Sequence, residues 1–219
     1  MLLKEIKYLL RKEILLEWRL KYALNGILLY VISTTFVCYL SFKIINHPAT
    51  WNALFWFIIL FASTNAVAKS FIQESKGRLL YLYTLVSPQA MILSKIIYNS
   101  FLMLIISVTT FLFYSLFIGN IVQDVPMFLV ALLLGSMGFS SVLTMVSAIA
   151  SKTNNNVTLM AILSFPILLP LLMSLLKLSK NAIDGLDRAV SFDYLIMLFS
   201  LNVIVIMLSY ILFPYLWKE

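Results

Sequence analysis

The sequence has little charge and almost no cysteine or histidine. Only 11% of its 219 residues are charged, against roughly 25% in an ordinary soluble domain, and 62% are hydrophobic. A soluble globule of this size could not bury so much apolar surface, so lipid must be part of its solvent. The composition therefore excludes a disordered chain, a disulfide scaffold, a coiled coil and a soluble enzyme.

The single cysteine, Cys38, and the single histidine, His47, exclude several kinds of site. One cysteine cannot form an intrachain disulfide, a Cys-x-x-Cys redox pair or a Cys-x-x-Cys-His heme attachment motif. The sequence also has no Gly-x-x-x-x-Gly-Lys-Ser/Thr loop that would bind the phosphates of ATP. His47 lies in a predicted loop, where a solvated histidine is more common than a heme ligand. We therefore predict no catalytic, cofactor-binding or metal-binding residue in this chain.

Six stretches without charged residues are each long enough to cross a bilayer. A transmembrane helix needs about 20 apolar residues. The sequence meets this requirement at 22–42, 48–68, 96–123, 125–151, 153–176 and 194–217. No charged residue lies within them, which disfavours proton-coupled transport. We predict an all-α integral membrane protein with six spans and a single transmembrane domain over 1–219.

The basic residues are concentrated on one side of the predicted bilayer. If the N-terminus is cytoplasmic, the cytoplasmic segments hold 12 of the 16 Lys and Arg but only 5 of the 9 Asp and Glu. This places the whole net charge of +7 inside, as the positive-inside rule expects. Both termini are therefore predicted to be cytoplasmic, and the basic charge needs no nucleic-acid partner. The outer loop 177–193 carries balanced charge that is typical of a solvated surface, a partner contact being the alternative.

Residues 1–21 predict an amphipathic helix ahead of the first span. Its apolar face holds Leu2, Leu3, Ile6, Leu9 and Leu10, and its basic residues Lys4, Lys7, Arg11 and Lys12 lie largely on the other side. Such a helix can lie in the membrane interface with its basic face toward anionic lipid headgroups. A topological anchor with no further role is the alternative. Glu13 and Glu17 fall near the apolar face and could instead face a protein partner.

Residues 69–95 form a predicted cytoplasmic segment that is too long for a turn. Gly77 permits a sharp bend. Ser87 and Pro88 restart a helix, because Ser is a good N-cap and Pro suits the first turn. We predict a short coupling helix docked on a cytoplasmic protein, and a long interfacial loop is the alternative. The predicted contact residues are Phe71, Gln73, Glu74, Gly77, Arg78, Leu79, Leu82 and Pro88.

This segment resembles the cytoplasmic coupling region of ABC-2-type transporter permeases. In that family an acid, a Gly, a Leu two residues later, a Pro and a Lys precede the third span. Here those places are occupied by Glu74, Gly77, Leu79, Pro88 and Lys95. Leu80 departs from the pattern, since many members have an acid three residues after the Gly. The resemblance implies an ABC-2-type permease fold and a separate ATPase subunit.

The fifth predicted span resembles that of one particular family of such permeases. Pro166 and Pro170 stand one helical turn apart, and each lacks an N–H, so together they free backbone carbonyls at mid-membrane. They predict a kink that lines a cavity or interface, or one that is simply packed. Their Pro-x-x-x-Pro-Leu-Leu order, after the polar turn 151–156, resembles the CcmB family, the heme exporter protein B of system I cytochrome c maturation. The resemblance covers essentially the whole chain.

The resemblance to the CcmB family implies a permease subunit of the bacterial inner membrane. It would couple ATP hydrolysis by a CcmA-type ATPase to heme export or to release of the heme-loaded periplasmic chaperone. ATP would be bound by that ATPase, and heme by a heme-handling membrane subunit and the chaperone, so neither a cofactor nor an enzymatic activity is expected here. A second copy of this chain and membrane lipid are further expected partners. The alternatives are an ABC-2-type permease for a lipid, drug or polysaccharide, and a non-transporting assembly subunit.

Overall fold

The computed structural model describes residues 2–20, 22–42, 45, 47–67, 71, 85–152 and 156–217. Within these ranges the regular structure is helical, with no strand. The helices are α1 (Leu2–Leu20), α2 (Tyr22–Phe42), α3 (Pro48–Val67), α6 (Pro88–Ile118), α7 (Val125–Ala150), α8 (Asn156–Asp184) and α9 (Arg188–Trp217).

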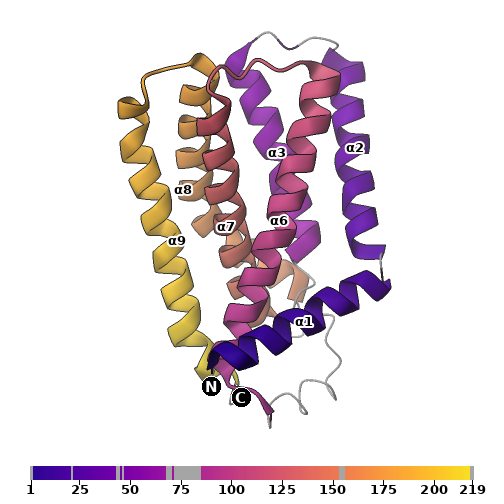
Figure 1. The fold of residues 1–219 in the computed structure, drawn as a ribbon, viewed down its shortest axis with the longest axis vertical. Helices are drawn as coiled ribbons and strands as arrows, with labels where there is room; N and C mark the ends of the chain where they lie inside the picture. The colour runs from indigo at the N-terminus through magenta and orange to yellow at the C-terminus, as the bar shows by residue number, and fades with distance from the viewer. Residues whose placement is uncertain are drawn as a thin grey trace.

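The described helices other than α1 are all long and apolar enough to cross a membrane, which gives six candidate spans in the described chain. They stand side by side as a bundle, and α1 lies against the lower part of α6 (Figure 1). Both ends of the chain lie at the same end of the bundle, which we call the terminal end, and we call the opposite end the distal end. The prediction of an all-α membrane protein with six spans and a separate N-terminal helix is confirmed.

Helix α6, which contains the predicted third span, has other bounds than the predicted 96–123, and its start agrees with the helix start predicted at Ser87 and Pro88. Helix α6 starts at Pro88, directly after Ser87 in extended conformation, and ends at Ile118 because Gly119 takes a φ of 101°. Lys95 marked the predicted start of the span, yet its side chain is only 2% exposed and lies within the helix. The charge therefore did not end the apolar stretch, and residues 88–95 belong to α6.

The predicted outer loop 177–193 is wrong in its extent. Helix α8 continues to Asp184 and α9 begins at Arg188, which leaves a short turn in which Gly185 takes a φ of 65°. Residues beyond 176 stay helical because Leu178, Ala182 and Ile183 are buried against the bundle. Lys177 and Lys180 lie on the exposed side of the same turns. Helix α8 also runs without a break through both of its prolines.

Helix α7 is the centre of the bundle and contacts α3, α6, α8 and α9. Its face toward α6 is lined with small polar side chains, which let membrane helices approach closely and hydrogen-bond across their interface. Three such hydrogen bonds join Ser107 to Ser136 at 2.9 Å, Ser100 to Ser140 at 3.0 Å, and Asn99 to Thr144 at 2.8 Å. The mid-span Asn99 is thus explained by helix packing.

Two glycines of α7 allow its close contact with α3 and α8. A Cβ atom on Gly135 would lie 2.8 Å from Cη2 of Trp56, and a Cβ on Gly138 would overlap Cδ1 of Leu171. Trp56 is itself fixed, because its indole N–H donates to Ser179 Oγ at 2.8 Å. The absence of a side chain at these positions therefore sets the spacing of three helices.

A buried aromatic cluster fills the distal half of the bundle between α3, α6 and α7. Trp51 and Phe55 stack with ring centroids 5.6 Å apart, and Tyr114 meets the Trp51 ring edge-on at 4.8 Å. Hydrogen bonds orient these rings: Trp51 Nε1 donates to the carbonyl of Gly119 at 3.0 Å, and the Tyr114 hydroxyl donates to the carbonyl of Trp51 at 3.1 Å. The distal end of α6 is thereby fixed to α3.

Candidate functional site

A second hydrophobic cluster, distinct from the main core, lies at the terminal end of the bundle. We call it the terminal cluster. Its buried members are Ile6, Leu9, Phe71, Ala90, Met91, Ile92, Ile96, Ala148 and Phe213. They come from α1, α6, α7, α9 and residue 71, so this one cluster ties together four helices and the end of the predicted coupling segment.

Phe71 was predicted to contact a cytoplasmic protein, and the structure places it inside the terminal cluster. Its side chain is 4% exposed, and its ring lies 5.5 Å from the ring of Phe213. The Nζ atom of Lys95 sits 4.9 Å from the centre of the same ring, within the range of a cation–π contact. Phe71 is therefore an anchor between α6 and α9, and any effect it has on a partner passes through this packing.

Pro88 begins α6 and is partly exposed. The other predicted contact residues lie outside the described residues: Gln73, Glu74, Gly77, Arg78, Leu79 and Leu82. Their contact with a partner stays a prediction. What the structure adds is that the chain on both sides of residues 72–84 is held by the terminal cluster, through Phe71 on one side and α6 on the other.

Helix α1 is joined to α6 by three glutamates along one face. Their contacts follow the same order along both helices. Glu5 Oε2 accepts from the backbone N–H of Ser87 at 3.0 Å and from its hydroxyl at 2.6 Å. Glu13 Oε1 lies 3.4 Å from Lys95 Nζ, and Glu17 Oε2 accepts from the Tyr98 hydroxyl at 3.2 Å. Glu13 and Glu17 were suspected of facing a protein partner. They face α6 of the same chain.

The electrostatics of this contact differ along its length. The hydrogen bond from the Ser87 hydroxyl, and to a lesser extent that from its backbone N–H, holds the pKa of Glu5 below its usual value. This carboxylate therefore stays charged at neutral pH. The Lys95 side chain is 2% exposed and that of Glu13 is 14% exposed. A buried charge needs a partner, because losing water without compensation is costly. Lys95 and Glu13 therefore form the part of the contact that the fold depends on most.

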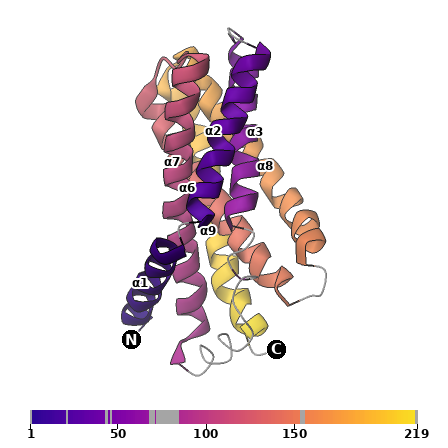
Figure 2. The same ribbon diagram turned by 90° about the vertical axis from the view of Figure 1, so that its right-hand side faces the viewer.

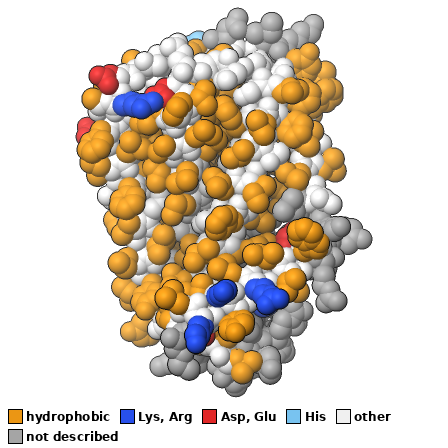
Figure 3. Space-filling view, viewed as in Figure 1, with side chains coloured by type: hydrophobic (Ala, Val, Ile, Leu, Met, Phe, Trp, Pro, Cys, Tyr) orange, Lys and Arg blue, Asp and Glu red, His pale blue; other side chains and the backbone are white. Residues whose placement is uncertain are grey.

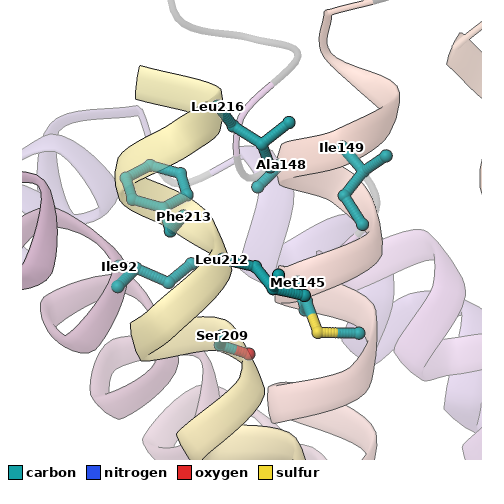
Figure 4. Close-up of a pocket in the computed structure, with 8 residues that line it drawn as sticks. All are labelled: Ile92, Met145, Ala148, Ile149, Ser209, Leu212, Phe213 and Leu216. Atoms are coloured by element: carbon teal, nitrogen blue, oxygen red, sulfur yellow. The ribbon is translucent and has the colours of Figure 1, made fainter. Parts of the chain in front are cut away.

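A small apolar cavity borders the terminal cluster between α6, α7 and α9 (Figure 4). It is lined by Ile92, Met145, Ala148, Ile149, Ser209, Leu212, Phe213 and Leu216. Its volume is about 10 Å³, which one water molecule would fill. The hydroxyl of Ser209 already donates to the carbonyl of Val205 at 2.7 Å. The cavity is thus a gap in the packing of the helix ends and is too small for heme.

The two prolines of α8 are not among the residues that line this cavity. Pro166 is exposed on the outer surface of the bundle and Pro170 is partly exposed. The Pro170 carbonyl accepts a hydrogen bond from the Ser174 hydroxyl at 2.9 Å. The neighbouring Phe165 is 60% exposed. Whether the prolines line an interface with a partner or are simply packed stays a prediction.

The described residues offer no metal site, since none of their His, Cys, Asp and Glu side chains gather in groups of three or more. Asn202 is the other polar residue of interest within a span. Its amide N–H groups donate to the carbonyls of Leu134 and Leu198, at 3.2 and 2.9 Å. The bond to Leu134 joins α9 to α7 and the bond to Leu198 stays within α9, which is consistent with a role for Asn202 in helix packing.

Together these features define a multi-pass, all-α integral membrane protein whose helices meet in a compact cluster at the end that carries both termini. A family model described as CcmB protein matches residues 4–214, which include five spans in full and most of α1 and α9. The chain belongs to the CcmB family, the heme exporter protein B family, and is a membrane permease subunit of the heme exporter in cytochrome c maturation. A comparison with curated proteins found no match.

Proposed function

We propose that this chain is driven by a separate CcmA-type ATPase that docks on residues 71–88, and that it uses the resulting motion for heme export or for release of the heme-loaded chaperone. The terminal end then faces the cytoplasm of the bacterial inner membrane, in agreement with the excess of Lys and Arg in the segments at that end. A heme-handling membrane subunit, the chaperone and a second copy of this chain complete the proposed complex.

The observation that carries this proposal is the anchoring of residues 72–84 on both sides by the terminal cluster. A partner that displaces this segment would pull on Phe71, which is wedged between Lys95 and the Phe213 ring. The displacement would therefore reach α6 and α9 together, and α1 through its glutamates. Packed helix ends of this kind shift between discrete arrangements rather than deform gradually.

Helix α6 is suited to carry such a shift across the membrane. It has 31 residues and no internal proline, which corresponds to a continuous helix of about 46 Å. Its terminal end lies in the terminal cluster, and at its distal end Gly119 accepts the hydrogen bond from Trp51 of α3. A movement started by an ATPase would thus displace α3 and the distal surface, where a bound chaperone could be released.

The experiment is a pull-down of the ATPase with the tagged chain from native membranes. We expect the double substitution Leu79→Asp and Leu82→Asp to abolish ATPase recovery while the chain still inserts and still recovers the heme-handling subunit. Leu186→Asp, an exposed leucine at the distal end, is the matched control and should leave recovery unchanged. Equal recovery of the ATPase with all three forms would reject docking on this segment.

A further inference from the structure

Helix α1 separates its charges between two faces. The acidic side chains Glu5, Glu13 and Glu17 all point to α6 and are engaged there. The basic side chains Lys4, Lys7 and Arg11 are all exposed, and within the described part of the chain none of them forms an ion pair. The exposed face of α1 is therefore positively charged although the helix as a whole contains acids.

Large apolar side chains flank these cations on the same face. At 100° per residue, Lys4, Lys7 and Arg11 form a central stripe together with Trp18. The exposed hydrophobic residues on its two sides are Leu3 and Ile14 on one, and Tyr8 and Leu15 on the other. Trp18 is 75% exposed. Figure 3 shows basic side chains near the terminal end of the molecule with hydrophobic side chains around them.

We propose that this exposed face of α1 binds the headgroups of anionic phospholipids. A surface with this composition suits neither water nor hydrocarbon. Its apolar side chains favour the acyl boundary, while Lys and Arg can extend their charged ends to the headgroups. Helix α1 is also at the right depth, because α2, the first span, begins at Tyr22 directly after it. Figure 2 shows α1 on the flank of the bundle beside α6.

Charge complementarity selects anionic lipid over zwitterionic lipid as the occupant. The three acids of α1 that could have neutralised Lys4, Lys7 and Arg11 are turned to the opposite face, so these cations are left without an acidic partner among the described residues and can attract an external anion. Each Lys or Arg near a membrane surface raises the binding constant for anionic lipid roughly five-fold. Because α1 is paired with α6, bound headgroups would also hold the terminal end of α6 at a fixed depth.

Trp18 provides a direct probe of the lipid beside this face. The full chain is reconstituted into vesicles of phosphatidylcholine and phosphatidylglycerol in which one lipid or the other carries bromine, which quenches tryptophan fluorescence on contact. The difference between the wild type and Trp18→Phe isolates the signal of this residue from those of the buried Trp51 and Trp56 and of the partly exposed Trp217. Quenching by each brominated lipid then measures its share of the contacts.

We expect brominated phosphatidylglycerol to quench Trp18 at least about two-fold more than its bulk share of the bilayer requires, and high salt to reduce this excess. Lys4→Gln with Lys7→Gln should remove most of the excess. Lys177→Gln with Lys180→Gln, which deletes equal charge at the distal end, should leave it intact. Equal quenching by the two lipids would overturn lipid selectivity. No quenching by either lipid would show that protein or water covers α1, which would also overturn the proposal.

Discussion

Lys95 and Lys12 allow a matched test of what holds α1 to the bundle. Both Nζ atoms lie 3.4 Å from the same oxygen of Glu13, but the Lys12 side chain is 25% exposed and that of Lys95 is 2% exposed. The two pairs therefore differ in burial rather than in distance. Lys95→Met keeps a side chain of similar length and removes the ammonium group, together with its contact to the Phe71 ring.

The expected loss of unfolding free energy follows from this burial. Lys95→Met leaves Glu13 without its buried partner, and breaking a buried ion pair in this way costs about 3 kcal/mol. Lys12→Met breaks a partly exposed pair and should cost less than about 1 kcal/mol. In Lys95→Met the Glu13 carboxylate keeps only the partly exposed Lys12 as its partner. Adding Glu13→Gln removes this carboxylate, so the double variant should recover part of the loss.

The assay is reversible unfolding in mixed micelles of dodecyl maltoside and sodium dodecyl sulfate, followed by circular dichroism. A loss of unfolding free energy in Lys95→Met no larger than that in Lys12→Met would show that burial of the ion pair contributes nothing to stability. A double variant that loses the sum of both single effects would also contradict a stabilising role of the buried pair. In that case the two side chains act separately rather than as a pair.

Three further outcomes are expected. Gly138→Val should cost about 1–3 kcal/mol of unfolding free energy in the same micelles, because its Cβ meets a buried leucine of α8. Gly26→Val should cost less, because the space around a Cβ at Gly26 is open. Equal losses would contradict the close packing of α7. The bidentate Arg188 contact lowers the pKa of Asp124, so this carboxylate stabilises the folded chain above its unfolded pKa. It loses that contribution as the pH falls through its lowered folded pKa. Measurements of unfolding against pH should therefore show that stability falls on acidification, and that it falls less in Asp124→Asn. Gly77→Trp should prevent co-purification of the ATPase without reducing membrane insertion, and unchanged co-purification would count against a bend at this position.

The six spans could be predicted from sequence because charge-free apolar stretches are a direct consequence of the bilayer. Their ends could not, because the same rule treats every charge as a boundary. Lys95 is buried with an acid from α1 and lies inside α6. Lys177 and Lys180 lie on the exposed side of turns that are helical on account of their buried neighbours. Both errors arise where tertiary contact or solvent access makes a charge acceptable in a helix.

The terminal cluster was not predicted, although part of the apolar face of α1 that enters it was. The helical spacing of Ile6 and Leu9 identified an apolar face, and the position of Glu13 and Glu17 near it signalled an acidic contact. The partner in that contact depends on the register of α1 against α6, which is set by residues more than 80 positions apart. Local periodicity carries no information on such a register. For the same reason the sequence could not show that Phe71 is buried.

The most direct measurement is photo-crosslinking in native membranes from a benzoylphenylalanine placed at Leu79 of the tagged full chain. If an ATPase docks on the coupling segment, the probe should form a covalent product with a small ATPase subunit. The same probe at Leu186, on the distal turn, should not. A probe at Leu79 that forms no ATPase product, in membranes where the ATPase is present, would contradict the coupling of this chain through its terminal end.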